Sequence, residues 1–101
     1  MSRAYRISRD AKTDLLQIWN HLAETASFAV ADKVINNLYV GMDKVAKRPG
    51  FGHRRTDLTE LPVKFYLVSP YLVVFADEEK PIGIVRVLHS ARDIPSILGK
   101  E

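Results

Sequence analysis

The residues best suited to chemistry lie in one run, residues 86–93, at the end of an apolar segment. Arg86, His89 and Arg92 in this run could present positive charge to a phosphate group, and His89 could act as a general acid or base near neutral pH. A purely structural interpretation is also open. In that case Arg92 pairs with Asp93, Asp57 or Glu60 and fastens the loop to the sheet.

Alternation along the apolar segment predicts which of these side chains share a face, because successive side chains of a strand point to opposite sides. One face is expected to carry Ile84, Arg86 and Leu88, and the other Val85, Val87 and His89. A cation on so apolar a strand needs either a partner or a path to solvent.

Other signals of catalysis or metal binding are missing from the sequence. The histidines, His21, His53 and His89, have no metal-ligand spacing, and the chain has no cysteine. Gly50 and Gly52 do not form a phosphate-binding loop, and no serine lies in a nucleophile elbow. We therefore expect no metal and no cofactor, and the usual signals of a hydrolase, kinase or dehydrogenase are missing.

Positive charge is concentrated in residues 44–55, although the whole chain has only a mild excess, with 15 Lys and Arg against 12 Asp and Glu. This segment contains Lys44, Lys47, Arg48, Arg54 and Arg55. It has two interpretations that the sequence leaves open: a nucleic-acid patch, or a helix end followed by a solvated loop.

The elements that must position these residues follow from hydrophobic periodicity. A short strand at residues 4–8 precedes a helix capped by Ser8 or Asp10, and a second helix begins after Ser27 and stops at Pro49-Gly50. A loop over residues 49–62 leads to three strands, at residues 63–68, 71–76 and 82–88. The order β-α-α-β-β-β predicts an α+β fold, with a helical hairpin packed on a small, mainly antiparallel sheet.

One domain over residues 1–101 fits this length. Trp19, Phe28, Phe65 and Phe75 lie on apolar stripes, so we expect them in the core. The apolar runs are far shorter than the about 18 residues that a membrane span needs. We expect a soluble, cytoplasmic protein with no membrane partner.

Five motifs in this order resemble the RelE/ParE superfamily of toxins from type II toxin–antitoxin systems, and the ParE branch most. The resemblance covers nearly the whole chain. The motifs are Asp14-Leu15-Leu16-x-Ile18-Trp19, Ala31-x-x-Val34, Pro49-x-x-Gly52-x-x-Arg55-x-Asp57-Leu58, Tyr71-Leu72-Val73-Val74-Phe75 and Arg86-Val87-Leu88-His89-x-Ala91-Arg92-Asp93.

The resemblance implies one of two activities. RelE-like toxins cleave mRNA on the ribosome with basic residues and a tyrosine, whose positions here fall on Val63, Phe65, Leu72 and about Ile97. ParE-like toxins instead inhibit DNA gyrase, block replication and arrest growth without a nuclease site. Because the nuclease set is missing, we expect a non-enzymatic gyrase inhibitor of the plasmid-stabilisation type, with the mRNA endonuclease as the alternative.

The resemblance also implies partners and sites. A cognate ParD-like antitoxin would neutralise the toxin by covering a groove that includes Leu15, Trp19 and Leu38, and DNA would be reached only indirectly through the complexes. Arg86, His89 and Arg92 are the expected target or phosphate contacts. The expected loop anchor consists of Arg55, Asp57 and Asp93.

Overall fold

Two serine caps set where the long helices begin in the computed structural model, which describes residues 4–78 and 80–99. Ser8 Oγ accepts a hydrogen bond from the Ala11 amide, and α1 follows as Arg9–Thr25. Ser27 Oγ accepts from the Val30 amide in the same way, and α2 follows as Phe28–Lys47. Both caps satisfy amides that have no partner within the first turn.

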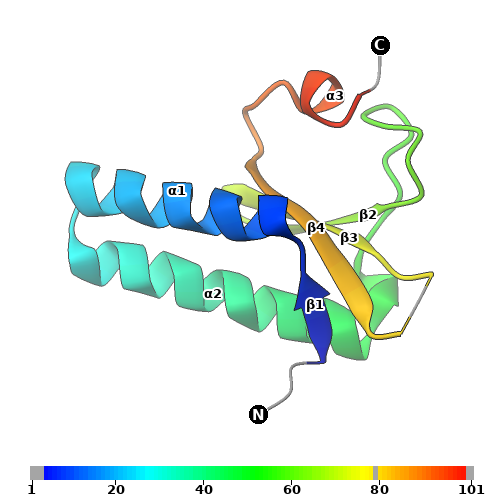
Figure 1. Cartoon of the computed structure of the whole chain (residues 1–101), viewed down its shortest axis with the longest axis horizontal. Helices are drawn as coiled ribbons and strands as arrows, with labels where there is room; N and C mark the ends of the chain where they lie inside the picture. Colours follow the sequence, from blue (N-terminus) through cyan, green and yellow to red (C-terminus); the bar gives the residue numbers. More distant parts are fainter. Residues whose placement is uncertain (1–3, 79, 100–101) are drawn as a thin grey trace.

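The two helices form an antiparallel hairpin whose closed end extends past the sheet (Figure 1). Across this end, Trp19 Nε1 donates to Asp32 Oδ1 at 2.8 Å, and the Trp19 and Phe28 rings lie 5.4 Å apart. Phe28 is 69% exposed, so its prediction as a core residue was wrong, whereas Phe65 and Phe75 are buried. The reason is position, since the first residue of α2 has no sheet beneath it.

The sheet has the order β1-β4-β3-β2. Its strands are β1 (Tyr5–Ile7), β2 (Lys64–Val68), β3 (Tyr71–Ala76) and β4 (Ile82–His89). The last three form the predicted antiparallel meander, and β1 pairs parallel with β4. The α+β fold and the β-α-α-β-β-β order are therefore confirmed.

A register shift in β4 changes the predicted assignment of its faces. Val74 pairs with Arg86 but Phe75 pairs with Ile84, so Val85 is left opposite no residue of β3. As a result Ile84 packs in one core cluster and Leu88 in the other, which corrects the prediction that they share a face. A bulge inserts one residue and so reverses the alternation beyond it.

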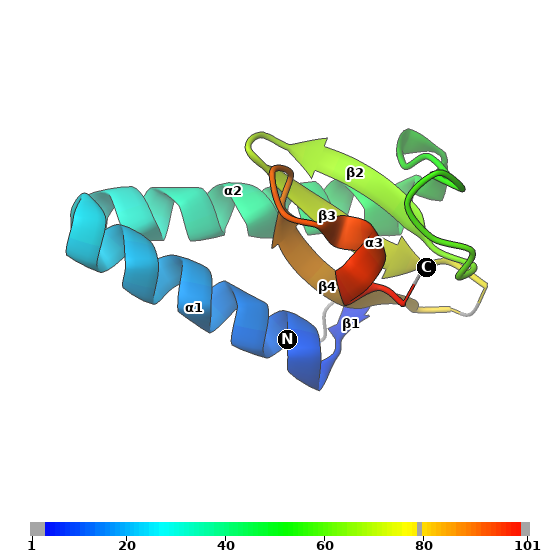
Figure 2. The same cartoon turned by 90° about the horizontal axis from the view of Figure 1, so that it is seen from above.

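Apolar clusters cover both faces of the sheet. The first lies between the sheet and the helical hairpin, and it includes Leu15, Leu38, Met42, Val73, Phe75 and Val87. The second lies on the opposite face and includes Val63, Phe65, Leu72, Val74, Leu88, Ile94 and Leu98. The short helix α3 (Ile94–Ile97) crosses β3 and β4 there, as seen from above in Figure 2. β3 is consequently buried on both faces, as its apolar sequence predicts.

The segment after α2 is held against the edge of the sheet. A short 3-10 helix, η1 (Pro49–Phe51), is followed by Gly52, where a side chain would overlap the ring of Phe75. His53 then exchanges two backbone hydrogen bonds with Phe65 on β2. Within the described residues, no helix combines the length and apolar character needed to cross a membrane.

Candidate functional site

A buried carboxylate on α1 holds the end of β4. Asp14 is only 5% exposed. Its Oδ2 accepts from Arg86 Nε at 2.8 Å and from the Val87 amide at 2.9 Å, and its Oδ1 accepts from Arg86 Nη2 at 2.9 Å. The need for this carboxylate follows from the topology. β1 ends at Ile7, opposite Ile84, so the Val87 amide has no partner strand and takes a side-chain acceptor instead.

Arg86 is therefore part of an internal ion pair rather than a free surface charge. Its hydrogen bonds to Asp14 raise the pKa of the guanidinium above its ordinary value, against the opposing effect of burial. The side chain of Arg86 is 22% exposed. Of the three predicted target contacts, Arg86 is thus held by Asp14, whereas His89 and Arg92 are exposed.

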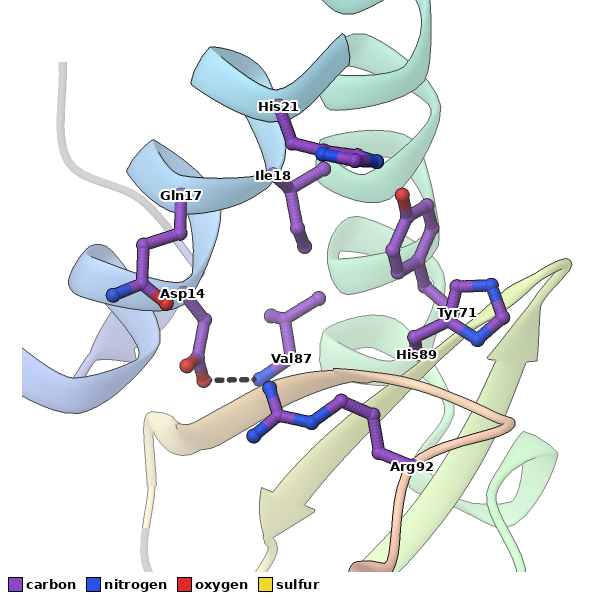
Figure 3. Close-up of a pocket in the computed structure, with 8 residues that line it drawn as sticks. All are labelled: Asp14, Gln17, Ile18, His21, Tyr71, Val87, His89 and Arg92. Atoms are coloured by element: carbon purple, nitrogen blue, oxygen red, sulfur yellow. Dashed lines mark hydrogen bonds between the residues drawn. The ribbon is translucent and has the colours of Figure 1, made fainter. Parts of the chain in front are cut away.

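A pocket of about 350 Å³ opens beside this ion pair, between α1 and the ends of β3 and β4 (Figure 3). Six of its eight lining residues have polar side chains, and the other two, Ile18 and Val87, are apolar. The lining residues are Asp14, Gln17, Ile18, His21, Tyr71, Val87, His89 and Arg92. Its size is at the lower end of the range for small-ligand sites, about 300–1,000 Å³.

Two rings at this pocket present hydrogen-bond donors. The His89 ring meets Tyr71 edge-on, with centroids 5.4 Å apart. His89 Nδ1 accepts a hydrogen bond from the Ala91 amide at 3.0 Å, so the ring proton of the neutral form lies on Nε2, where it can be donated. Burial raises the pKa of the Tyr71 hydroxyl, which keeps it protonated at neutral pH.

Arg92 supplies the accessible charge of the pocket. Its backbone amide donates to the His89 carbonyl at 3.0 Å, and its side chain reaches back toward Asp14 and Val87 (Figure 3). Among the described residues, no carboxylate forms an ion pair with Arg92. The structural interpretation, in which Arg92 is neutralised by Asp93, is therefore not what the chain adopts.

The predicted loop anchor is only partly assembled. Arg55 and Asp57 form a two-point ion pair, with Nε–Oδ1 at 2.9 Å and Nη2–Oδ2 at 2.8 Å. Both side chains are largely exposed, and the pair closes a turn between residues two apart. Asp93 does not join them, because its carboxylate accepts from Ser96 Oγ at 2.7 Å at the start of α3.

The predicted antitoxin groove divides into a surface part and a core part. Leu15 and Trp19 line a second, apolar pocket of about 280 Å³ between the two helices, although Leu15 is only 6% exposed and also packs in the first core cluster. Leu38 is fully buried, so it lies in the core and cannot contact a partner. Four residues of this pocket were not predicted: Lys12, Leu16, Ile35 and Tyr39. The sequence signal for this pocket was the presence of two further apolar residues, Leu16 and Ile35, directly beside buried positions of the helical stripes.

The positions that would carry nuclease residues are apolar and mostly buried. Val63, Phe65 and Leu72 are each at most 9% exposed and pack in the cluster beneath α3, with Ile97 against them. This cluster lies on the face of the sheet opposite the helical hairpin, whereas His89 belongs to the pocket beside α1. Within the described residues, no group of three or more His, Asp or Glu side chains could hold a metal ion.

Comparison with known proteins decides the family. The family model described as the ParE toxin of the type II toxin–antitoxin system parDE matches residues 5–94. The chain belongs to the ParE toxin family. This match covers every element of the fold up to the first residue of α3.

A solved structure supports the fold of this ParE family member. It is described as the chromosomal ParDE TA system from P. aeruginosa, and it matches with a TM-score of 0.71 at 22% identity, covering 86% of this chain and 95% of that one. No curated protein sequence matches the chain.

Proposed function

We propose that this ParE family member inhibits DNA gyrase in the cytoplasm, without catalysing a reaction, and that a ParD-like antitoxin neutralises it. The family match over residues 5–94 carries the proposal. The apolar cluster beneath α3 supports it further. The positions where a RelE-like nuclease would need cations are occupied there by packed apolar side chains.

The geometry disfavours phosphodiester cleavage. Such a reaction needs a group to take a proton, cations to neutralise the phosphorane and an acid to protonate the leaving oxygen. His89 and Arg92 lie at one pocket, but Arg86 is neutralised by Asp14. Lys64 is also committed, since its Nζ lies 2.8 Å from Asp77 Oδ2.

We assign target contact to the pocket beside α1. His89 and Arg92 present donors at its rim, and the Asp14–Arg86 pair fixes the strand that ends at His89, three residues before Arg92. A side chain held by a locked strand loses little entropy when it binds, which favours a specific contact. We expect Arg92 to contribute more than His89, because Arg92 is the accessible full charge.

We assign antitoxin binding to the outer side of the helical hairpin. Leu16 and Phe28 are 61% and 69% exposed there, close to the groove lined by Leu15 and Trp19. Apolar side chains this exposed are typical of a surface that a partner covers. The net charge of +3 favours an antitoxin with an acidic, extended segment.

The test of the gyrase proposal is a supercoiling assay with purified gyrase and toxin. Toxin should inhibit supercoiling and increase cleaved DNA. Arg92→Ala should inhibit several-fold less, His89→Ala slightly less, and both should melt like the wild type. Lys33→Ala, which removes an exposed cation on α2 away from the pocket, is the control and should inhibit fully.

The endonuclease alternative makes a different prediction in cells. Removing a general acid or base typically lowers the rate by about 10²–10⁴-fold, so His89→Ala would be inert rather than slightly weakened. Induced wild-type toxin should halt DNA synthesis and induce the SOS response before translation falls. If translation stops first, with mRNA cut in the ribosomal A site, the gyrase proposal is wrong.

A further inference from the structure

The proposed function leaves one charged surface unused, at the carboxyl end of α2. Lys47 lies three residues after Lys44 in the last turn of α2, and Arg48 is the residue that caps the helix end, so the three cations lie within one turn of chain. All three are exposed, and so is Arg54, which follows the edge residue His53. We name Lys44, Lys47, Arg48 and Arg54 the α2 basic end.

The charge of the α2 basic end is not compensated within the fold. The sequence has no acidic residue between Lys44 and Arg55. In the described part of the chain, Arg55, Lys64 and Arg86 each have a carboxylate partner, whereas none of the four cations of the α2 basic end forms an ion pair. This surface therefore presents cations to solvent that no ion pair neutralises among the described residues.

An exposed aromatic ring lies within this charge. Phe51 is 46% exposed, and the guanidinium carbon of Arg48 lies 6.0 Å from the centre of its ring. The backbone that carries the ring is fixed, because the Phe51 amide donates to the Arg48 carbonyl and the Gly52 amide donates to the Pro49 carbonyl, each at 3.0 Å. Clustered cations with an interleaved aromatic ring are a recurrent feature of surfaces that bind nucleic acid.

We propose that the α2 basic end binds the phosphate backbone of nucleic acid directly and without sequence preference. Stabilisation of the helix end accounts for Lys44, Lys47 and Arg48. It does not account for Arg54 or for the exposed Phe51, which both lie beyond the last turn of α2. A protein partner is the weaker match, because protein interfaces have an apolar centre and Phe51 is the only large exposed apolar side chain within described residues 44–55.

This activity goes beyond gyrase inhibition, which does not require the toxin itself to touch DNA. If the proposed function holds, weak backbone binding would concentrate the toxin near a DNA-bound target and raise its rate of association. The binding can be measured without gyrase. Failure of one proposal is therefore distinguishable from failure of the other.

The experiment measures fluorescence anisotropy of a labelled 30-base-pair DNA duplex with purified toxin, between about 50 and 200 mM salt. Non-specific binding of this kind has a Kd of about 10⁻⁴–10⁻⁶ M at physiological salt, and each neutralised phosphate contributes about 0.9 to the slope of log affinity against log salt. The patch variant replaces Lys44, Lys47 and Arg48 by Gln. We expect its slope to be smaller by about 2 to 3.

The matched control variant replaces three other exposed cations, Arg9, Lys33 and Lys80, by Gln. Both variants lower the net charge by the same amount, and Gln is a good helix former, so differences in folding should be small. The control should keep most of the wild-type slope. Equal loss in both variants would mean that net charge alone drives the binding, and the proposal would be overturned.

Further arms identify the nucleic acid and test the competing partner. The affinity for single-stranded DNA and RNA of equal length is compared with the affinity for the duplex. Phe51→Ala should weaken binding of single strands most, because unpaired bases can stack on an aromatic ring. A duplex slope that does not change in the patch variant refutes the proposal. The proposal is also refuted if the patch variant binds DNA normally and loses affinity only for the antitoxin. The surface would then be a contact for an acidic protein.

Discussion

Asp14 on α1 and Arg86 on β4 are 72 positions apart in sequence and form a two-point ion pair, with the third hydrogen bond of the carboxylate accepted from the Val87 amide. The carboxylate takes the place of the strand that would otherwise continue the sheet edge beyond β1. This side chain thus adds a polar attachment between α1 and the strand that ends at His89, beside the apolar packing of the hairpin on the sheet. This attachment gives Asp14 both a structural role and an influence on the pocket.

Replacing this carboxylate should destabilise the fold strongly. Asp14→Asn preserves the size of the side chain but leaves Arg86 without an opposite charge, and the amide cannot accept all three hydrogen bonds. Removing one partner of a buried pair typically costs about 3–5 kcal/mol, and the partial exposure of Arg86 reduces this to about 2–3 kcal/mol. Urea denaturation of the folded chain measures it directly.

The exposed Arg55–Asp57 pair provides the control, because it has the same two-point geometry on the surface. Asp57→Asn should change the free energy of unfolding by about 0.5 kcal/mol or less. A similar, small effect at both positions would contradict the role given to Asp14.

Substitution by alanine should destabilise the fold at Gly52 but not at the nearby Gly50. Gly52→Ala places a methyl group against the ring of Phe75 and 3.2 Å from Lys64 Cβ, and the buried ring cannot move aside. We expect a loss of about 1–3 kcal/mol, as is usual for overpacking. Gly50→Ala has open space at its Cβ and should leave the melting temperature nearly unchanged. Equal melting temperatures for the two variants would show that η1 lies elsewhere.

Local patterns account for most of the fold that could be predicted. The caps at Ser8 and Ser27, the helical spacing and the alternation of the strands are short-range signals, and the structure confirms the elements drawn from them. The faces of β4 could not be assigned correctly, because the bulge at Val85 depends on how β4 meets β3. Phe28 was misplaced for a related reason, since its spacing fits a stripe that runs past the sheet.

The site was harder to predict because its pairings are long-range. Arg86 and His89 were recognised by residue type, but the partner of Arg86 was not identified. A signal for it was present: Asp14 lies three residues after Ala11 and four before Ile18, on the apolar stripe itself. A carboxylate at such a position requires a buried partner. Tyr71 and His21 gave no comparable signal.

Two substitutions on the helical hairpin should separate an effect on stability from an effect on antitoxin binding. Leu38→Ala removes a fully buried side chain and should cost about 2–5 kcal/mol. Leu16→Ala removes a side chain that is 61% exposed, so it should leave the melting temperature unchanged while it weakens binding of the antitoxin. Calorimetric titration of the folded variant with antitoxin measures the second effect. Full affinity in Leu16→Ala would place the antitoxin on another surface.

Acid should weaken one specific interaction, the Lys64–Asp77 ion pair, which has an Nζ–Oδ2 distance of 2.8 Å. The hydrogen bond from Lys64 lowers the pKa of Asp77 below its ordinary value of 3.8 in the folded state. A carboxyl group with a lowered folded pKa stabilises the fold fully above its unfolded pKa, and this stabilisation disappears as the pH falls through the folded pKa.

Asp77→Asn should therefore be less stable than the wild type at pH 7, by about 1 kcal/mol or less because both side chains are partly exposed. The difference should shrink as the pH falls below about 4 and vanish once Asp77 is protonated in the folded state. Lys64→Gln should lose the same pH-dependent part of the free energy of unfolding. The double variant should show no further pH-dependent loss, since the two residues share one interaction. Urea denaturation of the four proteins between pH 7 and pH 3 measures these differences. A gap between wild type and Asp77→Asn that stays constant over this range would show that the effect of Asp77 does not depend on its charge.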